Sequence, residues 1–210
     1  PFGVYLTNGS IQAGANNFAL VSTGVVMSIC MWSAVAAVAL LSLGLERYTS
    51  MPVLNLWNAT QPAFNNILSG NGIGWYVLHL LPVLLFLAFM RIIPLAGYHA
   101  AEHQAVHAME RDEPLFIDVV RRMPRVHPRC GTNIMAGAFI FLSISEVLPA
   151  MQIGIDRADG TVLGALFTLF TWRRFGSFLQ QNFTTRPASD KQLLSGIKAA
   201  QEIEKKYMTA

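Results

Sequence analysis

The sequence predicts an all-α, polytopic membrane helical bundle with about four membrane segments, a cytoplasmic histidine-rich helix and a C-terminal amphipathic helix. Of the 210 residues, 53% are hydrophobic and 13% are charged, whereas soluble domains carry about a quarter charged residues. The mean hydropathy is +0.41. Long apolar runs recur along the chain, as expected for segments that cross a hydrocarbon core of about 30 Å. We therefore expect a single membrane domain over residues 1–210.

The first two apolar runs have the features of membrane-spanning helices. Residues 18–43 carry no charge, and residues 73–93 are flanked by Trp75 at their start and Arg91 at their end. An aromatic residue at one interface and a basic anchor at the other are typical of a span. Pro94 follows directly, and we expect it to interrupt the helix because proline lacks the backbone N–H donor.

The last two apolar runs are less clear. Residues 134–155 are interrupted by Glu146 and Pro149, and the run from Thr161 is apolar only as far as Trp172. About a dozen apolar residues are few for a complete crossing. This pair is therefore either a full hairpin or a re-entrant one.

Polar segments separate the apolar runs. Residues 1–17 and 44–71 are predicted loops, the second with a short interfacial helix around 54–68. The tail, residues 188–208, is predicted to be a soluble helix that opens on a capping box at Ser189. Its apolar stripe is expected to consist of Leu193, Leu194, Ile197, Ala200 and Ile203.

The basic residues predict the orientation. Six of the 15 Lys and Arg residues lie at Arg91 or in residues 96–132, and seven lie in residues 172–210. Because cytoplasmic loops are enriched in Lys and Arg, we expect both termini and the 96–132 segment in the cytoplasm, in a multi-pass protein of the inner (plasma) membrane. Membrane lipid and other membrane protein subunits are the expected partners. Nucleic acid is not, since no basic run is interleaved with aromatic residues.

Two short motifs hold four of the five histidines. The segment GYHAAEHQAVH, residues 97–107, places His99, His103 and His107 on one face of a helix with Glu102 at its edge. The segment HPRCGT begins at His127 and contains Cys130. Imidazoles beside a carboxylate and a thiol form a ligand set for a divalent metal, zinc above all.

The spacing of His99, Glu102 and His103 matches the H-x-x-E-H pattern of inverted zincins. In that pattern two histidines bind zinc and the glutamate is the general base. Such a site needs a further ligand, for which the candidates are His107, His127, Cys130 and, less favoured, Glu146.

Other interpretations of these residues stay open. His107 extends a polar face in one reading, and Cys130 packs as a small buried residue in another. Arg125 and Arg129, which flank His127, suit a lipid headgroup phosphate. His79, in the second span, is a candidate haem or chlorophyll ligand, although a hydrogen-bonded buried histidine is the more common situation.

The two motifs, YHAAEH at residues 98–103 and MPRVHPRCGT at residues 123–132, resemble the YqhQ-like bacterial membrane proteins. Residues 181–190 are similar to a third stretch of that family, and the resemblance covers about residues 75–205. This family of unknown function is regarded as one of metal-dependent enzymes, an inference drawn from the same histidines. The chain departs from it in lacking a Met- and Gly-rich N-terminal segment.

Two functions follow as hypotheses. In the first, the protein is an integral membrane metalloprotein, a zinc-type hydrolase whose H-x-x-E-H site lies at the cytoplasmic membrane face. In the second, it is a non-catalytic subunit of a larger membrane complex, for example a photosynthetic or respiratory one, with the His/Cys cluster as a structural staple. An open coordination position distinguishes the enzyme from the staple.

Overall fold

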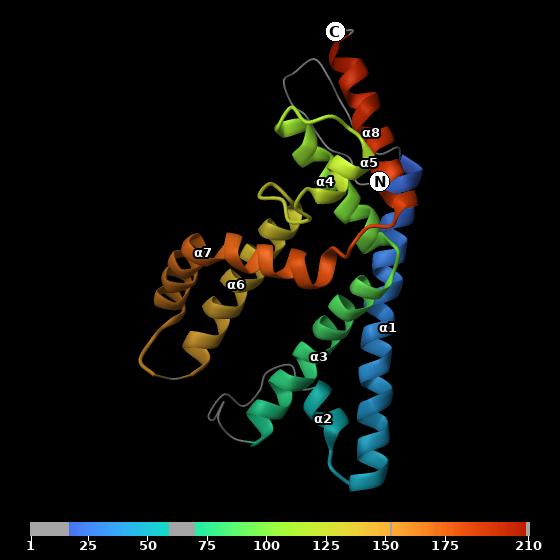
Figure 1. Cartoon of the computed structure of the whole chain (residues 1–210). Helices are drawn as coiled ribbons and strands as arrows, with labels where there is room; N and C mark the ends of the chain where they lie inside the picture. Colours follow the sequence, from blue (N-terminus) through green and yellow to red (C-terminus); the bar gives the residue numbers. More distant parts are fainter. Residues whose placement is uncertain (1–16, 59–69, 152, 209–210) are drawn as a thin grey trace. The chain divides into compact units, whose positions relative to one another are not determined.

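A computed structural model describes residues 17–58, 70–151 and 153–208, and every regular element in these ranges is a helix (Figure 1). The predicted all-α class is confirmed. In chain order the elements are α1 (Asn17–Thr49), α2 (Val53–Asn58), α3 (Gly70–Ile92), α4 (Leu95–Glu110), α5 (Ile117–Arg122), α6 (Gly131–Ala150), α7 (Arg157–Leu179), the π-helical turn η2 (Gln180–Thr184) and α8 (Asp190–Met208). Most of the predicted N-terminal loop, residues 1–16, lies outside the described residues.

Three of the described helices are long and apolar enough to cross a membrane: Val21–Thr49 of α1, Gly72–Ile92 of α3 and Gly131–Ala150 of α6. The chain is therefore a membrane protein. The fourth predicted segment forms the 23-residue helix α7, which is not among these candidate spans. Arg173 and Arg174 do not break it, because arginine is a good helix former.

Several predicted boundaries were wrong. α1 continues to Thr49 instead of ending at Leu43, because a polar surface does not stop a helix until a breaker arrives, here near Pro52. Of the predicted interfacial helix only α2, Val53–Asn58, falls within the described residues. α6 ends at Ala150 rather than near Ile155, just after Pro149. The expected break at Pro94 is present, between the end of α3 and the start of α4.

The chain divides into two compact units. The first contains residues 1–28, 90–132 and 177–210, and the second contains residues 29–89 and 133–176. In the second unit, glycines on α6 and α7 let the two helices approach closely. A Cβ atom on Gly164 would lie 2.6 Å from the hydroxyl oxygen of Ser145, and one on Gly137 would lie 3.3 Å from the Cβ of Trp172.

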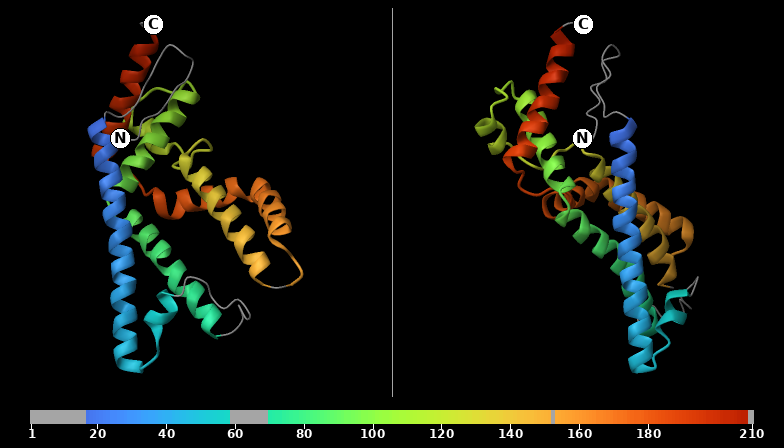
Figure 2. Two further views of the ribbon diagram at one scale, coloured as in Figure 1. Left: turned by 180° about the vertical axis from the view of Figure 1, so that it is seen from behind. Right: turned by 90° about the vertical axis from the view of Figure 1, so that its right-hand side faces the viewer.

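The core of the first unit is formed by α4, α5 and α8, which lie together in Figures 1 and 2. Small residues on one face of α4 allow α8 to pack tightly against it. A Cβ atom on Gly196 would come within 2.9 Å of the carbonyl oxygen of Ala101. The buried apolar residues of this core are Ala101, Ala105, Ala108, Val120, Leu193, Ile197 and Ala200.

The start of α8 fixes this packing. As the capping-box prediction requires, the side chain of Gln192 accepts a hydrogen bond from the Ser189 N–H, at 2.8 Å. Its Nε2 also donates to the carbonyl of Pro94, at 2.9 Å. The predicted apolar stripe was wrong at Leu194, which is 56% exposed, because adjacent residues point about 100° apart on a helix and Leu193 takes the buried position.

Candidate metal centre

The helix α4 has two faces with different chemistry. The alanine face packs on α8, and the opposite face carries His99, His103, His107 and Glu110 at spacings of three and four residues. Residues so spaced lie on one side of an α-helix. The burial of the alanine face therefore fixes the direction in which the histidine face points.

The loop between α5 and α6 covers the histidine face. Its backbone carbonyls accept hydrogen bonds from two of the imidazoles: Arg125 O from His103 Nδ1 at 2.6 Å, and Val126 O from His107 Nε2 at 2.9 Å. Buried Gln104 anchors this loop by donating to the carbonyls of Arg121 and Met123. The ring protons of the two histidines are thus assigned by the backbone.

Three side chains form the first cluster, namely His99, His103 and Cys130, whose donor atoms all lie within 4.8 Å of one another. His99 Nε2 is 3.3 Å from the Cys130 Sγ. The other ring nitrogen of His99 faces the Thr184 carbonyl at 2.9 Å. Both imidazoles therefore donate Nδ1–H to a backbone carbonyl. Both turn Nε2 towards the sulfur, where it is a lone pair in the neutral ring and an N–H donor in the protonated ring.

The thiol of Cys130 is strongly acidic. Although burial opposes the shift, hydrogen bonds to His103 and His99 lower the pKa of Cys130 to about 5. Cys130 also precedes α6, and the backbone N–H of Thr132 lies 3.4 Å from its sulfur, where a helix N-terminus favours negative charge. Burial lowers the pKa of His99, but the contacts with Cys130 outweigh it and the net shift is upward. In the metal-free site these shifts favour an ion pair, in which the Cys130 thiolate accepts a hydrogen bond from Nε2–H of a protonated imidazole.

The π-helical turn η2 supports the site from the C-terminal side. Thr184 supplies the carbonyl that holds His99, and the fully buried side chain of Gln180 accepts a hydrogen bond from the backbone N–H of His127 at 2.8 Å. A π turn places residues five apart over one another, here by the bond from Thr185 N–H to the Gln180 carbonyl. Such turns are frequent at functional sites.

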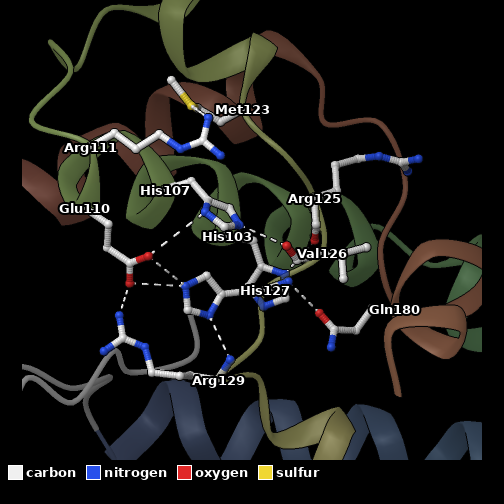
Figure 3. Close-up of polar contacts among 10 residues, drawn as sticks. All are labelled: His103, His107, Glu110, Arg111, Met123, Arg125, Val126, His127, Arg129 and Gln180. Atoms are coloured by element: carbon white, nitrogen blue, oxygen red, sulfur yellow. Dashed lines mark hydrogen bonds and ion pairs between the residues drawn. The ribbon is translucent and has the colours of Figure 1, made fainter. Parts of the chain in front are cut away.

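His107, Glu110 and His127 form the second cluster, shown in Figure 3. The Glu110 carboxylate lies 3.2 Å from His127 Nε2 and 4.0 Å from His107 Nδ1, and it pairs with the Arg129 guanidinium. The two clusters are neighbours, since the ring centres of His103 and His127 are 5.6 Å apart.

In the second cluster, hydrogen bonds fix the position of the His127 ring proton. Burial and the nearby His107 and His103 lower the pKa of His127 to about 4, so its ring carries one proton at neutral pH. His127 Nδ1 accepts the backbone N–H of Arg129 at 3.2 Å, which leaves the proton on Nε2, facing Glu110. A metal at His127 would have to displace this proton from beside a carboxylate, whereas in the first cluster it would replace a proton shared between Nε2 and the acidic thiol of Cys130.

The remaining predicted residues lie apart from these clusters. Glu102 is half-buried on the edge of the histidine face, and its charge contributes to the raised pKa of His99. His79 belongs to the second unit, where its Nδ1 contacts the Trp75 carbonyl at 2.8 Å and its ring stacks between Trp57 and Trp75. Glu146, also in the second unit, pairs with Arg157 near the end of α6.

Three residues of the site were not predicted from the sequence. Glu110 follows His107 by three residues on the same helix, so the periodicity of α4 could have identified it. Gln180 and Thr184 act through a buried amide and a backbone carbonyl, which carry no distinctive spacing. The stretch of resemblance over residues 181–190 includes Thr184 but begins one residue after Gln180.

Comparison with known proteins gives a family but no activity. Residues 7–155 match the family described as "Protein of unknown function (DUF1385)". This match includes residues 7–74, which the resemblance in the sequence did not cover. The chain is similar to the "Uncharacterized protein YqhQ" of Bacillus subtilis (strain 168), with 29% identity over 128 residues. That alignment covers 55% of this chain and 39% of the relative, so the chain spans well under half of the relative's length. No solved structure matches.

Proposed function

The chain belongs to the DUF1385 family, and from this premise we propose that it is a membrane metalloprotein that binds one zinc-type ion through His99, His103 and Cys130. We further propose that this site catalyses hydrolysis at the membrane surface. The observation that carries the proposal is the convergence of the Nε2 atoms of His99 and His103 on the acidic thiol of Cys130. The ring protons of both histidines are held elsewhere by backbone carbonyls.

The geometry of the first cluster supports a tetrahedral ion. Zinc bonds of about 2.3 Å to sulfur and 2.0–2.1 Å to nitrogen place the two donor atoms about 3.5 Å apart. The separation of Cys130 Sγ and His99 Nε2 is 3.3 Å, so an ion requires little movement. Metal-binding histidines generally donate their second N–H to a carbonyl or carboxylate, and His99 and His103 both do so. Two imidazoles and a thiolate favour zinc over magnesium or calcium.

Three protein ligands leave a tetrahedral ion one further position, and this supports a catalytic role over a staple. When bound, zinc supplies a Lewis acid and lowers the pKa of a water molecule. Glu102 is the proposed general base, since it lies between the two histidines in the H-x-x-E-H pattern and its charge acts on His99. In this proposal the second cluster holds the covering loop in place and binds no ion.

We also propose that the site faces the cytoplasm, from the distribution of Lys and Arg. The tail α8 packs on α4 in the same compact unit, so the C-terminus reports on the location of the site. A fluorescent protein that folds only in the cytoplasm, fused after Ala210, is expected to fluoresce. Alkaline phosphatase activity from the equivalent fusion would contradict this orientation.

The metal is tested by loading purified protein with zinc in a neutral detergent and measuring zinc per chain by mass spectrometry. We expect about one ion in the wild type, and clear losses in His103→Ala and Cys130→Ser. The matched controls are His107→Ala and His127→Ala, which remove imidazoles of the second cluster and are expected to retain the ion. Zinc loss in the controls but not in the first pair would assign the ion to the second cluster instead.

The catalytic part is tested separately with Glu102→Gln. This change preserves the size of the side chain and is expected to retain zinc but to abolish zinc-dependent hydrolysis of a generic probe, p-nitrophenyl acetate. A variant as active as the wild type would exclude Glu102 as the base. Zinc bound at full stoichiometry with no hydrolysis above the rate of free zinc would favour the structural staple.

A second candidate function uses the same thiolate without a metal. Cys130 Sγ contacts His99 Nε2, and Thr184 O orients the other ring nitrogen, an arrangement of nucleophile, base and orienting group. In this case the Cys130 sulfur would attack the carbonyl carbon of an ester or thioester and form an acyl–sulfur bond. The C–O or C–S bond would break, and the alcohol or thiol would leave with the proton held by His99. A chelator distinguishes the two functions: activity that survives chelation and is inhibited by added zinc favours the nucleophile, and activity restored by zinc favours the metal site.

A further inference from the structure

One nitrogen of the half-buried Arg125 side chain has no hydrogen-bond partner in the described part of the chain. Its backbone carbonyl holds His103, but its side chain extends away from the imidazoles (Figure 3). Within the described parts of the chain, its Nη1 atom is buried and makes no hydrogen bond. A buried donor that makes no hydrogen bond is costly, so the buried Nη1 of this side chain calls for an acceptor.

A second guanidinium lies nearby. Arg91, in the last turn of α3, donates to the carbonyls of Gln181 and Thr185. Arg125 borders the same segment through the imidazoles: its carbonyl bonds His103, whose ring centre lies 4.3 Å from that of His99, and His99 bonds the carbonyl of Thr184. Among the described residues, the ion pairs of this unit's arginines join Arg121 to Asp190 and Arg129 to Glu110. Within residues 17–58, 70–151 and 153–208, neither Arg91 nor Arg125 is paired with a carboxylate.

The surrounding segment contributes further groups of the same kind. Arg186 donates to the carbonyl of Ile92 at 2.8 Å, which places a third cation at the end of α3. The hydroxyl of Thr184 is buried and without a hydrogen-bond partner in the described chain. Guanidinium groups beside a segment with an unused buried hydroxyl offer donors for an oxyanion, and arginine suits phosphate because it offers a planar fork of donors.

The position of Arg91 along the chain places the site near the membrane surface. Arg91 is the second-to-last residue of α3, a candidate membrane span, so it lies where a span meets the headgroup layer. We propose that Arg91 and Arg125 bind a phosphate group at this end of α3, carried by a phospholipid headgroup or by a soluble phosphate compound. This site is distinct from the zinc ligands and does not depend on the proposed hydrolysis.

The test measures phosphate binding by calorimetry on the full chain in a maltoside detergent, with inorganic phosphate and with dihexanoyl phosphatidylglycerol as separate probes. Arg125→Gln is expected to weaken binding at least about tenfold, because hydrogen bonds to charged groups are among the strongest in proteins. The matched control is Arg122→Gln, which removes the same charge from an exposed residue bonded only to the Asp118 carbonyl of its own helix. It is expected to bind as the wild type does.

A second readout guards against misfolding. Because Arg125 makes no side-chain hydrogen bond within the described chain, Arg125→Gln is expected to melt at or above the wild-type temperature in phosphate-free buffer. Phosphate is expected to raise the melting temperature of the wild type and not that of the variant. Arg125→Lys keeps the charge without the fork and is expected to bind with intermediate strength.

The two probes identify the source of the anion. Arg125-dependent binding of the phosphatidylglycerol alone assigns the site to a lipid headgroup, and such binding of inorganic phosphate alone assigns it to a soluble compound. Equal binding by the wild type and Arg125→Gln for both probes would overturn the proposal. An equal loss in Arg122→Gln would also overturn it, since it would show only the general attraction of a cationic surface.

Discussion

The acidity of Cys130 allows a sharp test of the first cluster in metal-free protein. In a Cys30→Ser background, Cys130 is the only thiol of the chain. Hydrogen bonds from His99 and His103 lower its pKa to about 5, against the opposing effect of burial. Replacing both histidines by alanine removes these contacts and leaves burial, the largest cause, and the lesser opposing hydrogen bond with Thr132, so the pKa is expected near its ordinary value of 9.0.

The rate of alkylation at neutral pH is a poor measure of this change. At pH 7 the thiolate fraction differs about 100-fold between the two pKa values, but nucleophilicity falls with pKa at a Brønsted slope of about 0.4–0.5, which offsets about 40- to 100-fold. At pH 5 the thiolate fraction is about one half in the wild type and about one in 10,000 in the double variant. The wild type is therefore expected to react about 50- to 120-fold faster at pH 5.

The assay is iodoacetamide labelling from pH 4 to pH 10 in the presence of a chelator, followed by mass spectrometry. The wild-type rate is expected to reach its plateau above pH 6, with a midpoint near about 5. His107→Ala is the control, because His107 holds the covering loop through the Val126 carbonyl and is not a cause of the shift at Cys130. Its midpoint is expected to match the wild type.

Two results would refute the reasoning. A wild-type midpoint near 9 would show that the imidazoles do not stabilise the thiolate, and the convergence at Cys130 would be wrong. A midpoint that stays near 5 in the double variant would mean that the start of α6 alone produces the shift. In that case His99 and His103 would not be partners of the sulfur.

Three further predictions concern stability and the second cluster. The pKa of His127 is lowered in the folded state to about 4 from 6.5, so the unfolded chain takes up the proton first as the pH falls. Stability is therefore expected to be complete above pH 6.5 and to fall by up to about 3 kcal/mol towards pH 4, as measured by denaturant unfolding, and His127→Asn is expected to flatten this dependence. Gly196→Ala, whose Cβ would meet the Ala101 carbonyl at 2.9 Å, is expected to destabilise by about 1–3 kcal/mol. The control is Gly44→Ala, whose Cβ would have nothing within 4 Å and which is expected to be neutral or stabilising. Both variants are compared with the wild type by thermal unfolding, and equal losses of stability would argue against close packing of α4 on α8. Glu110→Gln weakens the contacts with His127 and Arg129, so it is expected to lower the melting temperature and leave the zinc content unchanged, and a loss of zinc would show that the second cluster takes part in binding.

Much of the helical organisation was predictable from local patterns. Apolar length identified the helices that contain the candidate spans, and Pro94 marked the break before α4. The capping box at Ser189 was found as expected. Helix ends were predicted less well. The polar residues after Leu43 predict a loop, whereas in the structure they continue α1. Polarity reports exposure to water, and an exposed turn of helix is as polar as a loop.

The candidate site divides in the same way. Periodicity along α4 placed His99, His103 and His107 on one face, and the second motif supplied His127 and Cys130 as further candidates. The sequence could not show which of these five residues face one another. Five predicted metal ligands separate into two clusters in the structure, because the carbonyls of Thr184, Arg125 and Val126 determine where each ring proton resides.

The sequence by itself determined the chemistry that is available: apolar lengths that suit a membrane, a helix with a histidine stripe, and a cysteine at the start of another helix. These are local properties, encoded by residues within a few positions of one another. Only the tertiary structure decided that η2 meets α4 and that Cys130 lies between two imidazoles. Those contacts join residues 31 and 85 positions apart, and their geometry depends on how α4 and α8 pack through small side chains that carry no signal of their partners.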